Sequence, residues 1–115
     1  MSIIKFPFGA ATLETPDSAA AISVDVANTK TLIQVSPVEA VTLDLVANDG
    51  LVVGSEVHVD IIQDATGRNV TFGNTGDTIV APDLVGVPND RDTIALVWNG
   101  TSFVGGVWNK VVDAA

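Results

Sequence analysis

A histidine with a nearby carboxylate is the first group of residues in this chain whose types could do chemistry. In "SEVHVDII" (55–62), His58 and Asp60 are two residues apart, so both point to the same face of a strand. A histidine oriented by a carboxylate can act as a general base, and Asp44 would lie nearby if strand 40–46 paired with this one. The chain has no serine or cysteine in a nucleophile motif and no second histidine. We therefore predict a surface histidine, no catalytic residues and no enzymatic activity.

The acidic segment "NDRD" (89–92) is a candidate calcium site. Calcium needs about six to eight oxygen ligands, and the segment offers only Asp90 and Asp92, without the spacing of a known calcium loop. We predict a solvated acidic loop, no metal and no cofactor. Three other aspartates face outward on predicted strands, and we expect them to be staggered because like charges directly opposite each other destabilise a sheet. They are Asp25, Asp44 and Asp60.

The composition restricts the classes of protein to which the chain could belong. Its 115 residues fit one domain. The net charge is −9 and the five basic residues are scattered, which argues against nucleic-acid binding. No apolar run approaches the ~20 residues of a membrane span, and there is no cysteine for disulfides. With 47% hydrophobic and only 17% charged residues, the chain is expected to bury surface against copies of itself or another protein.

Short alternating segments separated by turn residues predict an all-β fold. The expected strands are 21–26, 30–35, 40–46, 55–62, 69–72 and 78–81, followed by a closing hairpin. We see no helical periodicity and no internal repeat. Seven or eight short antiparallel strands in residues 20–115 predict a single-domain β-sandwich or a small jelly-roll-like barrel.

Residues 1–19 lack both strand alternation and helical period, and we predict an extended N-terminal arm. Four large apolar residues lie at its start: Ile3, Ile4, Phe6 and Phe8. A disordered tail is the alternative, because chain ends often fray. Burying each of these side chains is worth ~1.5–3 kcal/mol, which favours an arm that docks on a partner.

The closing segment "VWNGTSFVGGVWN" (97–109) is apolar on both of its predicted faces. Asn99-Gly100 predicts a two-residue type I′ turn, which would place Trp98 opposite Thr101. One face then belongs to the core with Trp98, Leu96 and Phe103. The second face carries Val97, Val104 and Trp108. We predict a subunit interface there; the alternatives are a sugar platform at Trp108, or coverage of this face by residues 82–91 or by the arm.

The chain resembles small virion proteins of tailed bacteriophages. The resemblance covers roughly residues 20–108 and rests on "ISVDVANTKTLIQVSPVEAVTLDLVANDGLVVGSEVHVDI" and on "DTIALVWNGTSFVGGVW". Similar turns and a similar final hairpin occur in capsid decoration (cement) proteins and in fibre and tail-tip domains. The chain differs from a fibre in having no long stalk.

This resemblance implies a non-enzymatic structural protein on the capsid surface of a virion. Such proteins are commonly homotrimers that bridge subunits of the major capsid protein, with an N-terminal arm in contact with the shell. In this chain the arm residues Ile3 to Phe8 would make that contact. A receptor- or glycan-binding tip module of a tail fibre is the alternative. The expected partners are the major capsid protein and further copies of this chain, with no nucleic acid and no membrane.

Overall fold

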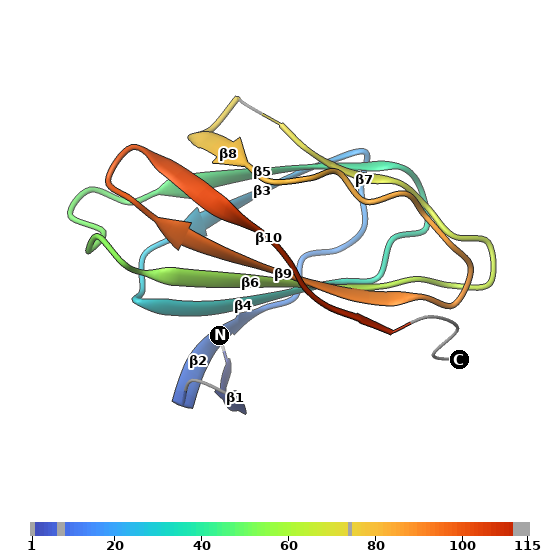
Figure 1. Ribbon diagram of the computed structural model, residues 1–115, viewed down its shortest axis with the longest axis horizontal. Helices are drawn as coiled ribbons and strands as arrows, with labels where there is room; N and C mark the ends of the chain where they lie inside the picture. The colour runs from blue at the N-terminus through green and yellow to red at the C-terminus, as the bar shows by residue number, and fades with distance from the viewer. Residues whose placement is uncertain (1, 7–8, 74, 112–115) are drawn as a thin grey trace.

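The computed structural model describes residues 2–6, 9–73 and 75–111, with side chains described for residues 11–73 and 75–107. These residues form ten strands and no helix (Figure 1). The strands are β1 (Ser2–Phe6), β2 (Gly9–Glu14), β3 (Ala21–Val26), β4 (Lys30–Val35), β5 (Val41–Ala47), β6 (Glu56–Ile62), β7 (Val70–Phe72), β8 (Thr78–Val80), β9 (Arg91–Trp98) and β10 (Ser102–Val111). The strands predicted from β3 to β8 match these bounds to within one residue at each end.

The strands form a β-solenoid of about three turns. The chain passes back and forth between two sheets, so that β2, β4 and β6 lie side by side in the larger sheet. Strands β3, β5 and β7 lie side by side in the smaller one. Within each set of three, all neighbouring strands are parallel. Each turn of the solenoid therefore consists of one strand from each sheet.

The predicted antiparallel sandwich or jelly roll is wrong. Alternating apolar and polar residues show only that one face of a strand is buried, and this holds for solenoid strands as well as for sandwich strands. The repeat is hidden because the turns differ in length. From Ala21 to its neighbour Thr42 one turn spans 21 residues, whereas from Thr42 to its neighbour Thr71 the next spans 29.

Further strands extend the larger sheet on both sides of β2, β4 and β6. Strand β9 pairs antiparallel with β6, β10 pairs antiparallel with β9, and β8 joins the far side of β10 in parallel. At the other end β1 pairs antiparallel with β2, so the segment predicted as an arm contains a hairpin. In Figure 1 this hairpin projects from the edge of the larger sheet beyond β4. The predicted capsid contacts of Ile3, Ile4, Phe6 and Phe8 lie outside the described side chains.

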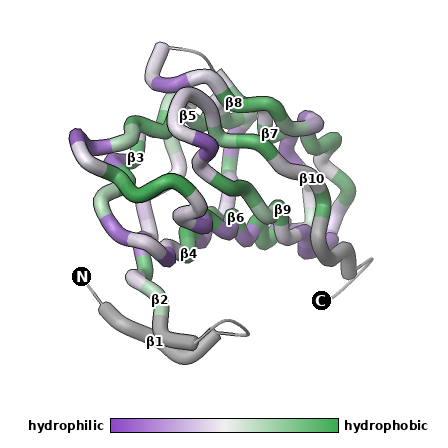
Figure 2. The backbone as a smooth tube through the Cα atoms, turned by 60° about the vertical axis from the view of Figure 1, so that its left-hand side comes forward, coloured by the Kyte–Doolittle hydropathy of each residue, from purple (hydrophilic) through white to green (hydrophobic). Residues whose placement is uncertain are grey.

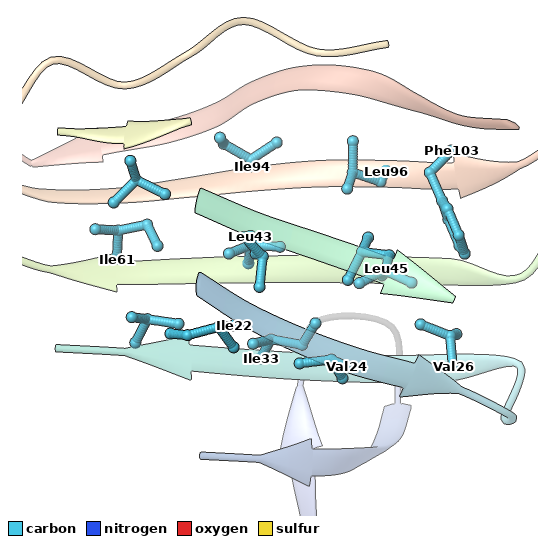
Figure 3. Close-up of a cluster of buried hydrophobic side chains, with 14 of the residues drawn as sticks. Ile22, Val24, Val26, Ile33, Leu43, Leu45, Ile61, Ile94, Leu96 and Phe103 are labelled. Atoms are coloured by element: carbon cyan, nitrogen blue, oxygen red, sulfur yellow. The ribbon is translucent and has the colours of Figure 1, made fainter. Parts of the chain in front are cut away.

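The core lies between the two sheets and follows the predicted alternation. Figure 2 shows hydrophobic and hydrophilic residues alternating along the strands. Leu43 and Leu45 of β5, Ile61 of β6 and Ile94 of β9 are completely buried, and Figure 3 shows them gathered in one cluster. Because each such side chain contributes about 1.5–3 kcal/mol, this cluster holds the two sheets together.

The closing hairpin differs from its prediction in register. Trp98 pairs with Phe103, and Leu96 pairs with Gly105, so the loop from Asn99 to Ser102 has four residues instead of two. The carboxamide oxygen of Asn99 accepts hydrogen bonds from the backbone N–H groups of Thr101 (3.0 Å) and Ser102 (2.8 Å), which stabilises the longer loop. Only Gly100 of the Asn-Gly pair has positive φ, which excludes a type I′ turn. A shift of two residues keeps Leu96, Trp98 and Phe103 on one face and Val97 and Val104 on the other, as predicted.

Candidate functional site

His58 lies on the outer face of the larger sheet, and it is buried there. Its neighbours in register are Leu32 on β4 and Ala95 on β9, and only 3% of the residue is exposed. The predicted surface histidine is therefore wrong. Strand β5 belongs to the other sheet, so Asp44 is not the neighbour of His58.

Asp60 binds an arginine instead of orienting His58. Its two carboxylate oxygens accept hydrogen bonds from Nε (3.1 Å) and one terminal nitrogen (2.7 Å) of Arg91, and the Gln34 amide donates a third at 3.3 Å. The hydrogen bond to Asp60 raises the pKa of Arg91. This paired geometry joins β4, β6 and β9 across the outer face, which is a structural role.

The burial of His58 gives the protein a pH-dependent stability. Burial lowers the pKa of His58 below 6.5, and the Glu56 carboxylate offsets part of this shift. Because the unfolded chain then binds the proton more readily, His58 contributes stability that is present above pH 6.5 and is lost as the pH falls through its folded pKa.

We expect His58→Gln to reduce this acid sensitivity. Thermal unfolding of both proteins from about pH 7.5 to 5 should show that wild type loses more of its Tm than the variant, since glutamine does not titrate. Every other titratable group is present in both proteins, so the difference between the two curves isolates His58. Parallel curves would contradict the prediction.

The acidic segment 89–92 is folded into the structure. Asp90 and Asp92 are buried, so the predicted solvated loop is wrong for both. Asn89 has a positive φ of 62°, and its N–H donates to the Asp64 carbonyl at 2.9 Å, which anchors the segment before β9. Within the described side chains, no three acidic, histidine or cysteine residues form a group that could hold a metal ion.

The prediction of staggered aspartates is confirmed for Asp25 and Asp44. On the smaller sheet Asp44 pairs with Ser23, and Asp25 pairs with Val46, so no two carboxylates lie directly opposite each other. Asp60 lies in the other sheet. Asp44 is nevertheless buried, because the loop after β7 covers it. In this loop the Thr75 N–H donates a hydrogen bond to the Asp44 carboxylate at 3.1 Å.

An exposed row of valines crosses three strands on the outer face of the larger sheet. Val97 of β9 pairs with Val104 of β10, which in turn pairs with Val80 of β8. Their exposed fractions are 44%, 39% and 54%, respectively. The row, called the valine row below, includes two of the three predicted interface residues. The side chain of the third, Trp108, lies outside the described part of the chain.

Trp98 lies on the opposite face, as predicted, and belongs to the core. Its ring packs against Phe103 with 4.8 Å between ring centres and a tilt of 45°. The residue also borders a cavity of about 510 Å³ at the tip of the closing hairpin, next to Asp49 and Asp77. This cavity could not be predicted from local patterns, because its walls come from three separate segments of the chain.

Comparison with protein families and with curated proteins finds no match to this chain. Within the described residues, no helix is long and apolar enough to cross a membrane.

Proposed function

We propose that this chain is a non-enzymatic structural subunit of a virus particle, a capsid decoration (cement) protein that forms a homotrimer on the shell of a tailed bacteriophage. The observation that carries the proposal is the valine row. Three directly paired, exposed valines leave apolar surface in water, and burying such surface yields about 25 cal/mol per Å².

The row's position favours contact between copies of the chain. It ends at β8, which is an edge strand of the larger sheet. In the other direction it meets Glu56 and Lys30, the residues in register with Val97 on β6 and β4. An apolar centre with a charged rim is the usual composition of a subunit interface.

The solenoid supports a mechanical role. Its parallel strands bond to the turns before and after them, which makes the body a stacked, quasi-one-dimensional structure. A trimer of such bodies would bridge neighbouring shell subunits, and stable interfaces of this kind bury about 1,200–2,000 Å² each. Attachment at three points would hold the trimer on the particle through avidity.

The first test is the number of copies of this chain per purified particle, relative to the major shell protein. A decoration protein should be present in hundreds of copies, whereas a handful would indicate a tail or fibre component. Absence from the particle would overturn the proposal.

A second test measures the mass of the assembly by light scattering. We expect the wild type to have about three times the chain mass of 11.8 kDa. We expect Val97→Asp to be monomeric, because an unpaired charge buried in the interface disrupts the contact. Val85→Asp is the matched control, because Val85 is exposed but lies outside the valine row. An unchanged mass for Val97→Asp would exclude the row as the interface.

A receptor- or glycan-binding module of a tail fibre is the second candidate function. A separate observation favours it, namely the cavity beside Trp98, which combines an aromatic residue with carboxylates.

A further inference from the structure

The cavity at the tip of the closing hairpin is built from turns that the fold holds in place. Asn48 follows β5, and its N–H donates to the Val26 carbonyl at 2.9 Å, while its own carbonyl accepts from the Leu51 N–H at 3.0 Å. The Gly54 N–H donates to the Trp98 carbonyl at 2.8 Å, which ties this turn to the hairpin. The cavity, of about 510 Å³, is therefore formed before any ligand binds.

One part of the cavity wall is apolar. Trp98 lines it with Leu51 and Val53, and Val53 is among the most exposed large hydrophobic residues described. Trp98 is only 8% exposed, because its ring is held against Phe103 in the core. A ligand would therefore meet mainly the aliphatic side chains of Leu51 and Val53, beside the small exposed part of the Trp98 ring.

The other part of the wall is polar and has capacity for further hydrogen bonds. The side chains of Asn48 and Asp49 are exposed, and neither makes a hydrogen bond within the part of the chain that the structure describes. Asp77 accepts the Ala47 N–H with Oδ2 at 2.7 Å, which leaves its second oxygen available. The Thr101 hydroxyl donates to Asn99 at 3.1 Å and can still accept.

We propose that this cavity binds a neutral saccharide unit. Carboxylate and amide groups accept hydrogen bonds from sugar hydroxyls, while the apolar wall covers the C–H face of a pyranose ring. A cavity of this volume accommodates a small ligand. The inference rests on the second candidate function and not on the assembly role.

The lining argues against two other ligand classes. Asp49 and Asp77 repel an anion, and no basic residue is among the described lining residues. A quaternary ammonium ion is bound by exposed aromatic faces, often several together, whereas this cavity has one aromatic residue that is mostly covered. A neutral, hydroxyl-rich ligand fits both the acidic rim and the small aromatic surface.

The test uses the methyl glycosides of glucose, galactose, mannose and N-acetylglucosamine as probes at millimolar concentration. Saturation-transfer NMR with the full chain should detect binding of at least one of them. We expect Asp49→Ala to weaken the affinity for that glycoside at least tenfold. Asp25→Ala is the matched control, because this exposed aspartate on β3 lies outside the cavity, and it should leave the affinity unchanged.

Folding failure does not complicate this comparison, because the Asp49 side chain bonds to no described residue and its loss should leave the Tm unchanged. The proposal is overturned if none of the four glycosides binds, if Asp49→Ala binds as wild type does, or if choline displaces the bound glycoside at a lower concentration than a second glycoside does. Each of these results would leave the proposed assembly role standing, because that role depends on the valine row.

Discussion

Gly105→Ala is expected to destabilise the fold by about 3 kcal/mol, the upper end of the usual range for overpacking. A Cβ at this position of β10 would lie 1.7 Å from the Ala95 carbonyl oxygen of β9, a rigid backbone atom. The two strands would have to separate where Gly105 pairs with Leu96, which is completely buried.

Gly106→Ala is the matched control for this prediction. A Cβ at Gly106 meets nothing within 4 Å, and the two glycines are adjacent in the same strand. The gain from restricting the unfolded chain, about 0.4–1 kcal/mol, is common to both substitutions. Thermal unfolding should therefore show a Tm lowered by roughly 10–20 °C for Gly105→Ala and a Tm raised by a few degrees at most for Gly106→Ala. Equal Tm values for the two variants would show that β9 and β10 are not in this register.

The positions of the strands could be predicted from the sequence because they depend on local signals. "AISVDV" places Ile22, Val24 and Val26 on one face, and all three are buried while the residues between them are exposed. Turn residues such as Gly50 and Gly54, both with positive φ, mark where the chain leaves a strand. These signals act within a few residues, so a single sequence contains them.

The partners of the strands could not be predicted in the same way. A parallel neighbour is a full turn away, and the turns of this solenoid have unequal length and dissimilar sequence. Thr42, for example, lies beside Thr71 although 29 residues separate them. Antiparallel pairing between successive segments was the natural expectation, but the successive strands from β2 to β7 lie in opposite sheets.

The candidate sites show the same division between local and distant information. Alternation predicted that Val97 and Val104 share a face, and both are exposed there. The burial of His58 depends on its neighbours Leu32 and Ala95, which come from strands that the sequence did not pair with it. The cavity needs the turn after β5, Asp77 and the hairpin tip together, so only the folded chain shows it.

A disulfide between Thr42→Cys and Thr71→Cys is expected to form, and it tests the solenoid directly. The two residues pair in register on β5 and β7, with 3.3 Å between their hydroxyl oxygens. The chain has no cysteine of its own, so no other disulfide competes. Closing a loop of 29 residues should stabilise the oxidised form by about 3–4 kcal/mol over the reduced form in the chain-entropy model.

Ser23→Cys with Thr71→Cys is the matched control. Strand β5 lies between β3 and β7, and Ser23 is also two residues further along the sheet than the row of Thr42 and Thr71. These positions are therefore more than two strand spacings apart, which is more than about 9 Å. A disulfide cannot span more than about 7 Å between Cα atoms without backbone movement. Thiol titration after air oxidation should find the first pair bonded and the control pair free, and thermal unfolding with and without reductant should show the stabilisation only in the first. A free first pair, or a bonded control pair, would mean that β5 does not lie between β3 and β7, and the parallel three-strand sheet would have to be abandoned.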